Sequence, residues 1–493
     1  MSAHRIAIIG AGVAGLAAAF SIQQTDPDAQ VELFEASPRV GGAIGTERIG
    51  EYLIERGADM FATDPPAAMK LCEELGIADT LISPLPTARG AAIFHRGKLV
   101  RIPEGFVLMR PTRMLPMMTT PLLSIAGKIR LLCEPFISRR EDKQDESIES
   151  FVVRRLGRET LERIVQPLVG GIYTGDVAAL GMAATMAQFH EMERRDGSLF
   201  RATRRRNREG SDSVEQNSAG ARYEKFRSFP GGMIQLIEAL AARIDPKRLH
   251  LDTAVTALER ETEGWVLSTH AGEQGPFDHV IVATPAKHAS SMLSSVDEKL
   301  ADELSSIRFA SSVVVVVVAK KIDMDPTMDV AGFVVPIAEK RNVLAVSFTG
   351  DKFAGRTPSD ERLMRVFIGG ELQSELLSQS DDALVSLAID ELGSLIGLRG
   401  KPLLTKVVRW NDAMPQYHIG HLERLARIDA LLVNHPGISL IGNSFHGVGI
   451  APTIAHATKV ARLVVESKFH PPAQRKGRTM SPGRANAPDP LRP

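Results

Sequence analysis

The feature that most restricts the fold is a glycine-rich turn near the start of the chain. Gly10, Gly12 and Gly15 have the spacing G-x-G-x-x-G, between an apolar run and a run of small, helix-forming residues. Gly10 permits a tight turn, Gly12 lets backbone N–H groups approach a pyrophosphate, and Gly15 allows a helix to pack closely on a strand. Glu35 ends the next strand-like run and can accept hydrogen bonds from a ribose. This order predicts a dinucleotide-binding unit.

The same stretch has a second interpretation as a secretory signal, because Arg5 precedes an apolar run that ends near Phe20. Signal cores seldom contain three patterned glycines followed by a strand, so the dinucleotide interpretation is favoured. The charges balance, with 59 Lys and Arg against 59 Asp and Glu, which gives no reason to expect a nucleic-acid partner. Cys72 and Cys133 have no ligand spacing, and we expect two buried structural thiols in a reducing compartment and no metal site.

Further along the chain, the pattern predicts specific elements. Helices are expected at 67–75, from Ser147 onward with Ile148, Phe151, Val152 and Leu156 on one face, and from Met233 to about Ile244. Six consecutive valines at 313–318 predict a buried strand within an antiparallel sheet at about 304–403. The basic stretch 194–208 and the polar stretch 209–220 are interpreted as a solvated, mobile loop, with carboxylate or anionic-lipid binding as the alternative.

After Glu35 come Arg39, Gly41 and Gly42, in the order E-x-x-x-R-x-G-G. At this point the sequence resembles the FAD-binding flavoprotein oxidases, the superfamily of amine oxidases, carotene desaturases and protoporphyrinogen oxidases. Three later stretches are similar to the porphyrinogen oxidases in particular. They are G-I-Y-x-G-D at 171–176, A-x-P-Q-Y at 413–417, and G-N-x-x-x-G-V-G-I at 442–450.

The resemblance implies an α/β fold. A Rossmann-like FAD-binding domain of the amine oxidase and p-hydroxybenzoate hydroxylase type would be interrupted by a mixed-sheet substrate domain and a helical, membrane-associating insertion. The corresponding boundaries are a discontinuous FAD-binding domain at 1–84, 225–300 and 405–466, a helical substrate- and membrane-binding insertion at 85–224, a substrate-binding β-sheet domain at 301–404, and a disordered tail at 467–493.

The resemblance also implies which residues hold FAD. A helix with Pro452 in its first turn would direct its positive end to the flavin N1 and O2, where negative charge gathers on reduction. The expected cofactor residues are Gly10, Ala11, Gly12, Val13, Ala14, Gly15, Glu35, Ala36, Arg39, Gly41, Gly42, Ala43, Gly57, Ala58, Asp59, Met60, Val255, Trp410, Ala413, Val448, Gly449 and Ile450.

The implied activity is an oxygen-using oxidase of heme biosynthesis. It would convert protoporphyrinogen IX or coproporphyrinogen III to the porphyrin in three two-electron steps with release of hydrogen peroxide. Because the flavin carries the chemistry, we expect no catalytic side chain. The expected substrate residues are Arg110, Arg113, Tyr173 and His446. The eukaryotic-type arginine two residues after P-x-G is absent after Pro103–Gly105, so the substrate orientation should differ, as in the bacterial type that acts on coproporphyrinogen III. The sequence alone does not separate the two substrates.

The remaining expectations concern partners and location. We expect a cytoplasmic homodimer that contacts the inner face of the cell membrane peripherally and hands its product to a ferrochelatase. Two alternatives share the nucleotide motifs. An amine oxidase or carotenoid desaturase is one, although the chain has no cysteine after Cys133 that could link a flavin. The other is a flavin-free carrier of prenylated small GTPases, which would be colourless when purified.

Overall fold

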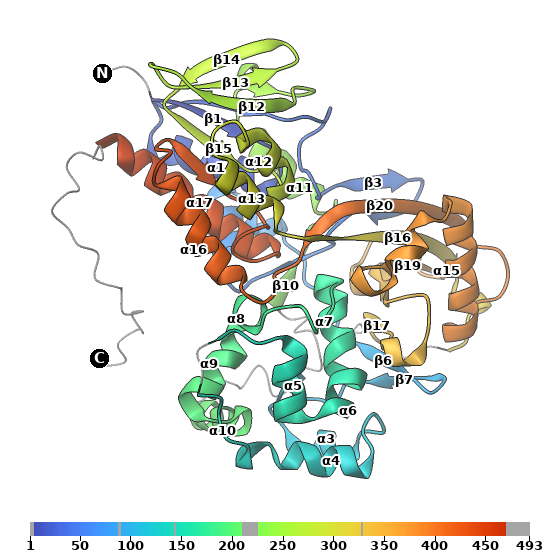
Figure 1. Ribbon diagram of the computed structural model, residues 1–493. Helices are drawn as coiled ribbons and strands as arrows, with labels where there is room; N and C mark the ends of the chain where they lie inside the picture. Colours follow the sequence, from blue (N-terminus) through green and yellow to red (C-terminus); the bar gives the residue numbers. More distant parts are fainter. Residues whose placement is uncertain (1–3, 87–89, 142–143, 210–224, 327–328, 470–493) are drawn as a thin grey trace.

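The computed structural model describes residues 4–86, 90–141, 144–209, 225–326 and 329–469. They form three lobes (Figure 1). We name them the nucleotide lobe, at the top of the figure, the sheet lobe, at the right, and the helical lobe, at the bottom. The predicted tail, apart from its first three residues, lies outside the described part, as does most of the polar stretch 209–220.

The nucleotide lobe is assembled from the two ends and the middle of the chain. Its five-stranded parallel sheet has the order β11-β2-β1-β15-β21. The elements of the lobe are β1 (Arg5–Ile9), α1 (Val13–Thr25), β2 (Gln30–Phe34), β3 (Thr46–Ile49), β4 (Tyr52–Glu55), β5 (Phe61–Ala62), α2 (Ala67–Leu75), β10 (Phe226–Arg227), α11 (Ile234–Ala241), β11 (Leu249–His250), β12 (Val255–Arg260), β13 (Trp265–Thr269), β14 (Gly272–Phe277), β15 (His279–Val282), α12 (Ala286–Leu293), α13 (Glu298–Ser305), α16 (His421–Leu432), β21 (Ile438–Leu440) and α17 (Ile450–Phe469).

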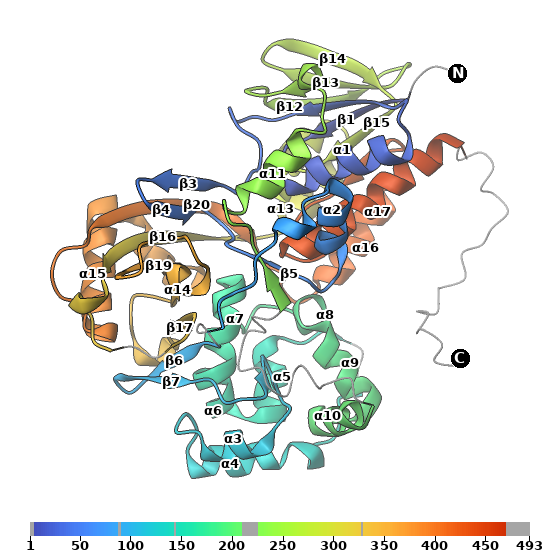
Figure 2. The ribbon, with the colours of Figure 1, turned by 180° about the vertical axis from the view of Figure 1, so that it is seen from behind.

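Strand β1 lies in the middle of this sheet and is buried on both faces. Ile6 and Ile8 pack into the cluster that contains α1 and α17, whereas Ala7 and Ile9 pack into the cluster on the opposite face with α12, α13 and α16. An apolar run without alternation is what a parallel strand covered on both faces requires. Helices α1 and α17 lie side by side in both views, so the two ends of the chain pack together (Figures 1 and 2).

The sheet lobe has seven strands in the order β20-β16-β19-β18-β17-β6-β7, antiparallel except for the parallel pair β17 and β6. The predicted antiparallel region thus recruits residues 92–101, which the sequence placed in the helical insertion, and 405–415, which it placed with the nucleotide lobe. The elements are β6 (Ala92–His95), β7 (Lys98–Arg101), β16 (Phe309–Lys320), β17 (Gly332–Val334), β18 (Ala345–Phe348), α14 (Thr349–Lys352), β19 (Glu361–Gly369), α15 (Asp381–Ile396) and β20 (Leu404–Pro415).

The valine run is the buried strand that the sequence predicted. Successive side chains of a strand point to opposite faces, and the six valines of β16 divide accordingly. Val313, Val315 and Val317 pack into the cluster that contains α15, whereas Val314, Val316 and Val318 pack with Ile54 of β4. The second face therefore attaches β4, and the residues that follow it, to the sheet.

The helical lobe lies below the other two (Figures 1 and 2). Helix α5 buries the apolar face expected from the sequence, and the Ser147 hydroxyl accepts from Ser150 N at its start. The elements are β8 (Phe106–Val107), β9 (Arg110–Pro111), α3 (Met114–Thr119), α4 (Ile125–Leu132), α5 (Ile148–Leu156), α6 (Arg158–Thr160), a π-helix at Leu161–Val165, α7 (Gln166–Tyr173), α8 (Met182–Thr185), α9 (Ala187–Asp196) and α10 (Leu199–Arg208). Short 3₁₀ turns at Ala78–Thr80, Glu134–Phe136, Pro246–Arg248, Lys321–Asp323, Ile337–Glu339 and Glu371–Ser378 complete the fold of the three lobes.

Two expectations were wrong. Residues 194–208 are not a mobile loop but the end of α9 and the whole of α10, because arginine favours helices and Arg205 pairs with Asp196 at 2.9 Å. Cys133 is exposed, whereas Cys72 is buried as expected, and burial raises the pKa of the Cys72 thiol to about 12. Among the described residues, no helix is both long enough and apolar enough to cross a membrane.

Candidate functional site

The two ends of the chain meet at one edge of the parallel sheet. Strands β1, β15 and β21 are neighbours with the same direction, so the residues after their carboxyl ends, Gly10, Ala283 and Gly442, share that edge. Gly10 has φ +105°, and a Cβ there would lie 3.2 Å from the Ala283 carbonyl oxygen. Ligands of open parallel sheets bind at this carboxyl edge. The geometry therefore places the N-terminal turn and the C-terminal loop on one site.

The glycines of the turn have different tasks. A Cβ on Gly15 would lie 1.9 Å from the Gly10 carbonyl oxygen, so only glycine lets α1 pack against the turn. A Cβ on Gly12 would meet no described heavy atom within 4 Å and would project into open space at the start of α1. An open position beside a helix N-terminus is what a diphosphate requires. The turn therefore fits the diphosphate of FAD.

A second glycine pair closes the cradle. Gly41 N donates to Ala11 O at 2.8 Å, which ties this loop to the first turn. The Arg39 guanidinium donates hydrogen bonds to three carbonyl oxygens of its own loop, at 2.8–3.2 Å. Arg39 thereby stabilises the turn in which Gly41 and Gly42 both adopt positive φ.

Glu35 lies between the glycine turn and β12. One carboxylate oxygen accepts from Ala11 N at 2.8 Å, and the other accepts from Ser37 N at 3.0 Å. The Glu35 carbonyl accepts from Thr253 N at 2.8 Å, which brings Val255, the first residue of β12, to the same edge. A carboxylate in this position fits the ribose-binding role predicted for it.

Gly57 is the point where the nucleotide and sheet lobes converge. A Cβ on Gly57 would lie 2.1 Å from the Ala43 carbonyl oxygen and 3.5 Å from the Trp410 ring. The Trp410 indole N–H donates to Arg56 O at 3.0 Å, and the Arg365 guanidinium donates to Gly57 O at 2.5 Å. Residues from β19, β20 and the second glycine loop thus fix the segment after β4.

A buried ionic cluster of Asp59, Lys352 and Arg365 also holds this segment in place. Asp59 forms an ion pair with Lys352 and lies 3.8 Å from Arg365, and all three side chains are at most 10% exposed. Burial alone would raise the pKa of Asp59, but the two cations hold it below its usual value. The sequence analysis listed Asp59 as a cofactor residue, and it did not identify its partners Lys352 and Arg365. A charged residue inside the apolar run 363–368 was the available signal for Arg365.

The C-terminal loop leads into α17, which begins at Ile450, so Pro452 lies in its first turn as predicted. Val448 packs against the apolar cluster of the helical lobe, which joins this loop to that lobe. The remaining predicted cofactor residues adjoin those described above: Val13 and Ala14 begin α1, Ala36 follows Glu35, Ala58 and Met60 flank Asp59, Ala413 lies near the end of β20, and Gly449 precedes α17.

The four predicted substrate residues lie in different environments. Arg110 is buried and donates to Thr203 Oγ1 at 3.3 Å, whereas Arg113 forms a surface ion pair with Glu104 at 3.1 Å. The buried Tyr173 hydroxyl donates to Thr185 O at 3.3 Å, and burial raises its pKa to about 12. His446 is exposed and packs edge-on against the ring of His456, with centroids 4.4 Å apart.

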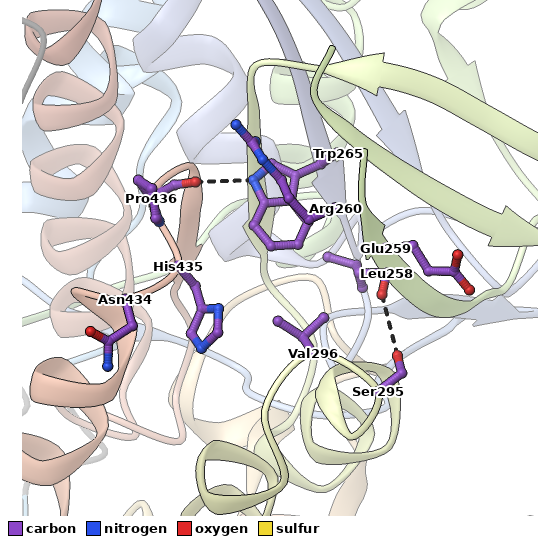
Figure 3. Close-up of a pocket in the computed structure, with 9 residues that line it drawn as sticks. All are labelled: Leu258, Glu259, Arg260, Trp265, Ser295, Val296, Asn434, His435 and Pro436. Atoms are coloured by element: carbon purple, nitrogen blue, oxygen red, sulfur yellow. Dashed lines mark hydrogen bonds between the residues drawn. The ribbon is translucent and has the colours of Figure 1, made fainter. Parts of the chain in front are cut away.

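Two surface cavities lie elsewhere on the nucleotide lobe. The first, of about 460 Å³, lies between β12, β13 and the residues after α12 and α16 (Figure 3). In it, the Trp265 indole N–H donates to Pro436 O at 3.1 Å, and Ser295 Oγ donates to Leu258 O at 3.3 Å. The second, of about 650 Å³, lies between α13 and α16. Neither is lined by a predicted site residue, so the site rests on the geometry of the sheet edge.

Comparison with known proteins agrees with this geometry. The family model of flavin containing amine oxidoreductases matches residues 13–465. The chain is 34% identical to a coproporphyrinogen III oxidase of Propionibacterium freudenreichii, over 94% of this chain and 91% of that protein. It is 30% identical to a coproporphyrinogen III oxidase of Bacillus subtilis, over 91% and 95%. A crystal structure from Exiguobacterium sp. 255-15 superposes with a TM-score of 0.81 at 28% identity, covering 94% of this chain and 99% of the other.

Proposed function

This chain belongs to the flavin containing amine oxidoreductase family and is an FAD-dependent oxidoreductase, and we propose that it oxidises coproporphyrinogen III to the porphyrin in heme biosynthesis. Two relatives that bear this name align over more than nine-tenths of their length and of this chain. Protoporphyrinogen IX is the alternative substrate. The flavin site is supported by the meeting of both glycine turns with the C-terminal loop at one sheet edge, and the substrate is supported by the two relatives.

When bound, FAD would supply the acceptor for a hydride from a methylene bridge of the substrate, and oxygen would restore its oxidised form with release of hydrogen peroxide. The residues of this chain would hold and orient the cofactor. The open position at Gly12 would admit the diphosphate, and the Glu35 carboxylate would accept hydrogen bonds from the ribose. The Arg365 contact with Gly57 O fixes the segment after β4, which would border the flavin ring. No side chain is assigned a proton-transfer role, because the chemistry belongs to the cofactor.

An apolar wall next to the C-terminal loop supports a large, apolar substrate. Val448 of the loop and Val334 of β17 both pack against the main cluster of the helical lobe, which includes Leu168 and Tyr173. All three lobes therefore contribute to one apolar cluster, against which the C-terminal loop packs. A tetrapyrrole offers an extensive apolar surface for such a wall, whereas a small polyamine does not.

Parallel kinetics with chemically reduced coproporphyrinogen III and protoporphyrinogen IX test the substrate. We expect porphyrin fluorescence to appear with both, and kcat/KM to be higher for coproporphyrinogen III. The opposite preference would reassign the enzyme to protoporphyrinogen IX. Turnover of a polyamine without turnover of either porphyrinogen would refute the proposal. The purified protein should be yellow, and the anaerobically reduced protein should regain its flavin absorbance in air.

We further propose that the helical lobe contacts an anionic membrane surface. On α4, Ile125, Ile129 and Leu132 recur on one face and are exposed, while the opposite face is buried. Phe136, in the following turn, is 86% exposed, and Arg201 lies beside it, donating to Pro135 O at 3.0 Å. Exposed apolar groups beside a cation match the interface of a bilayer that contains anionic lipid.

Vesicle flotation tests this contact. The protein should float with vesicles of phosphatidylglycerol and phosphatidylcholine, and less with phosphatidylcholine alone. Phe136→Ser should reduce the bound fraction several-fold, since it removes apolar area from the interface. Ile322→Ser is the matched control, because Ile322 is also 86% exposed but lies in the sheet lobe. Equal losses in both variants would contradict a specific contact surface.

We propose a cytoplasmic homodimer that passes its product to a ferrochelatase. The resemblance to the porphyrinogen oxidases supports this, and a poorly soluble porphyrin gives a physical reason for direct transfer. Light scattering during gel filtration measures the mass against 53.5 kDa for one chain. A mass of one chain at micromolar concentration would contradict the dimer.

A further inference from the structure

The A-x-P-Q-Y stretch has a task that the proposed reaction leaves unassigned. Its last residue, Tyr417, is 1% exposed, and the hydroxyl group makes two hydrogen bonds. It donates to Asn443 O at 2.5 Å and accepts from Gly447 N at 2.9 Å. A single side chain thus joins both ends of the five-residue loop 443–447, which lies between β21 and α17.

His421 reinforces the same contact. This first residue of α16 is buried, and its ring stacks on Tyr417 with centroids 4.1 Å apart and an interplanar angle of 12°. His421 Nε2 lies 3.1 Å from Phe445 O, in the middle of the loop. Burial lowers the pKa of His421 to about 4, so the ring is neutral at neutral pH. A carbonyl oxygen can only accept, and Nε2 therefore carries the hydrogen.

The segment that bears these two side chains is also attached to the helical lobe. Tyr417 O accepts from Gly181 N at 2.8 Å, and Gln416 Nε2 donates to Tyr173 O at 2.9 Å. The C-terminal loop is therefore held in place by a segment that is fixed to another lobe.

The loop needs such support. Gly442 and Gly447 have φ of +124° and +112°, conformations that glycine adopts without strain but that leave the chain many alternatives when unsupported. The next residues, Val448 and Gly449, lead directly into α17, whose first N–H groups have no partner within the helix. The position of the loop thus sets the path by which the chain enters the positive end of α17.

We propose that Tyr417 and His421 form a clamp that positions residues 443–450 against FAD. Both are positioning residues, since they act through the loop and not on the substrate. This inference depends on FAD binding, which family membership establishes, and not on the identity of the porphyrinogen. It can therefore fail while the proposed reaction stands, and the reverse also holds.

The test is FAD release from the holoenzyme, followed as the rise in flavin fluorescence on dilution. Tyr417→Phe removes only the hydroxyl and keeps the stacked ring, and two lost hydrogen bonds should raise the Kd for FAD about tenfold. The flavin absorption spectrum should shift, and the midpoint potential should become more negative as the end of α17 loses its alignment. Tyr52→Phe is the control, because Tyr52 lies on β4 beside Glu361, away from the loop.

A second pair of variants covers the case in which Tyr417→Phe fails to fold. His421→Gln keeps an N–H donor, whereas His421→Ala does not, so FAD should bind more tightly to the Gln variant than to the Ala variant. If all these variants keep the wild-type Kd, spectrum and potential, the clamp is refuted. A lower Tm with an unchanged flavin spectrum would likewise overturn the proposal, because it would show that the contacts serve stability alone.

Discussion

The glycine cradle of the nucleotide lobe and an arginine–glutamate cluster of the helical lobe hold the backbone in place in opposite ways. The cradle, Gly10, Gly12, Gly15, Gly41 and Gly42, brings backbone against backbone because side chains are missing. The arginine–glutamate cluster consists of Glu134, Arg154, Arg155 and Glu193. Its largely buried charged side chains join α5, α9 and the turn Glu134–Phe136. The first device is local in sequence, and the second connects distant residues.

The difference teaches which features a sequence exposes. Gly12 and Gly15 are recognisable because their roles depend on neighbours a few positions away. Arg155 donates to Glu193, to Glu134 at 3.3 Å, and to the carbonyl oxygens of Ile137 and Gly197, all from other segments. Nothing around Arg155 in the sequence indicates these partners. The two regions should therefore respond differently to substitution.

The largest expected loss of stability is in the arginine–glutamate cluster of the helical lobe. Arg155→Met leaves the buried Glu134 without this cation and leaves Glu193 with Arg154 alone, so we expect the free energy of unfolding to fall by about 3–5 kcal/mol. Urea unfolding followed by circular dichroism measures it. Arg158→Met is the control, because Arg158 is 61% exposed and pairs with Glu149 at the surface, where such a pair contributes about 1 kcal/mol or less. Similar losses in the two variants would contradict the role assigned to burial.

The next effect separates two glycines of the same turn. Gly15→Ala places a Cβ 1.9 Å from the Gly10 carbonyl oxygen, and the free energy of unfolding should fall by about 3 kcal/mol. Gly12→Ala meets no described heavy atom within 4 Å and should change it by less than about 1 kcal/mol. Equal stability of the two alanine variants would show that the close approach of α1 to the turn is not needed.

Gly12→Val should change the stability little but should abolish FAD binding. The side chain fills the space that the diphosphate needs, so the protein should fold, with the circular dichroism of the wild type, yet purify without yellow colour. The ratio of flavin to protein absorbance measures the occupancy. A fully yellow Gly12→Val protein would refute the cofactor site.

The smallest effect concerns pH and the clamp on the C-terminal loop. The pKa of His421 is lowered from 6.5 to about 4 in the folded protein, so the stability from its neutral form is fully present above pH 6.5 and is lost as pH falls towards 4. At pH 5.5 the loss amounts to about 1 kcal/mol. In His421→Gln, which has no titrating ring, the free energy of unfolding should fall less steeply between pH 6.5 and 5.5. Parallel pH profiles for the two proteins would contradict this.

Much of the architecture could be predicted because its signals are short-range. The turn at Gly10, the apolar face of α5 and the valine strand β16 each depend on residues within one element, where steric and periodic rules apply. The prediction failed for residues 194–208, where charge was interpreted as solvation although arginine is a good helix former. It also failed for Cys133, whose exposure depends on what covers α4.

Local sequence patterns were sufficient to predict a dinucleotide unit near the start of the chain, a buried strand at 313–318 and a resemblance to flavin oxidases. The folded chain was needed to see that Arg365 contacts Gly57 O, that Lys352 pairs with Asp59, and that Tyr417 holds both ends of the loop at 443–447. The reason is physical. Glycine spacing and side-chain periodicity act over a few residues, whereas a buried charge or hydroxyl is satisfied by whichever distant group the folded chain brings to it.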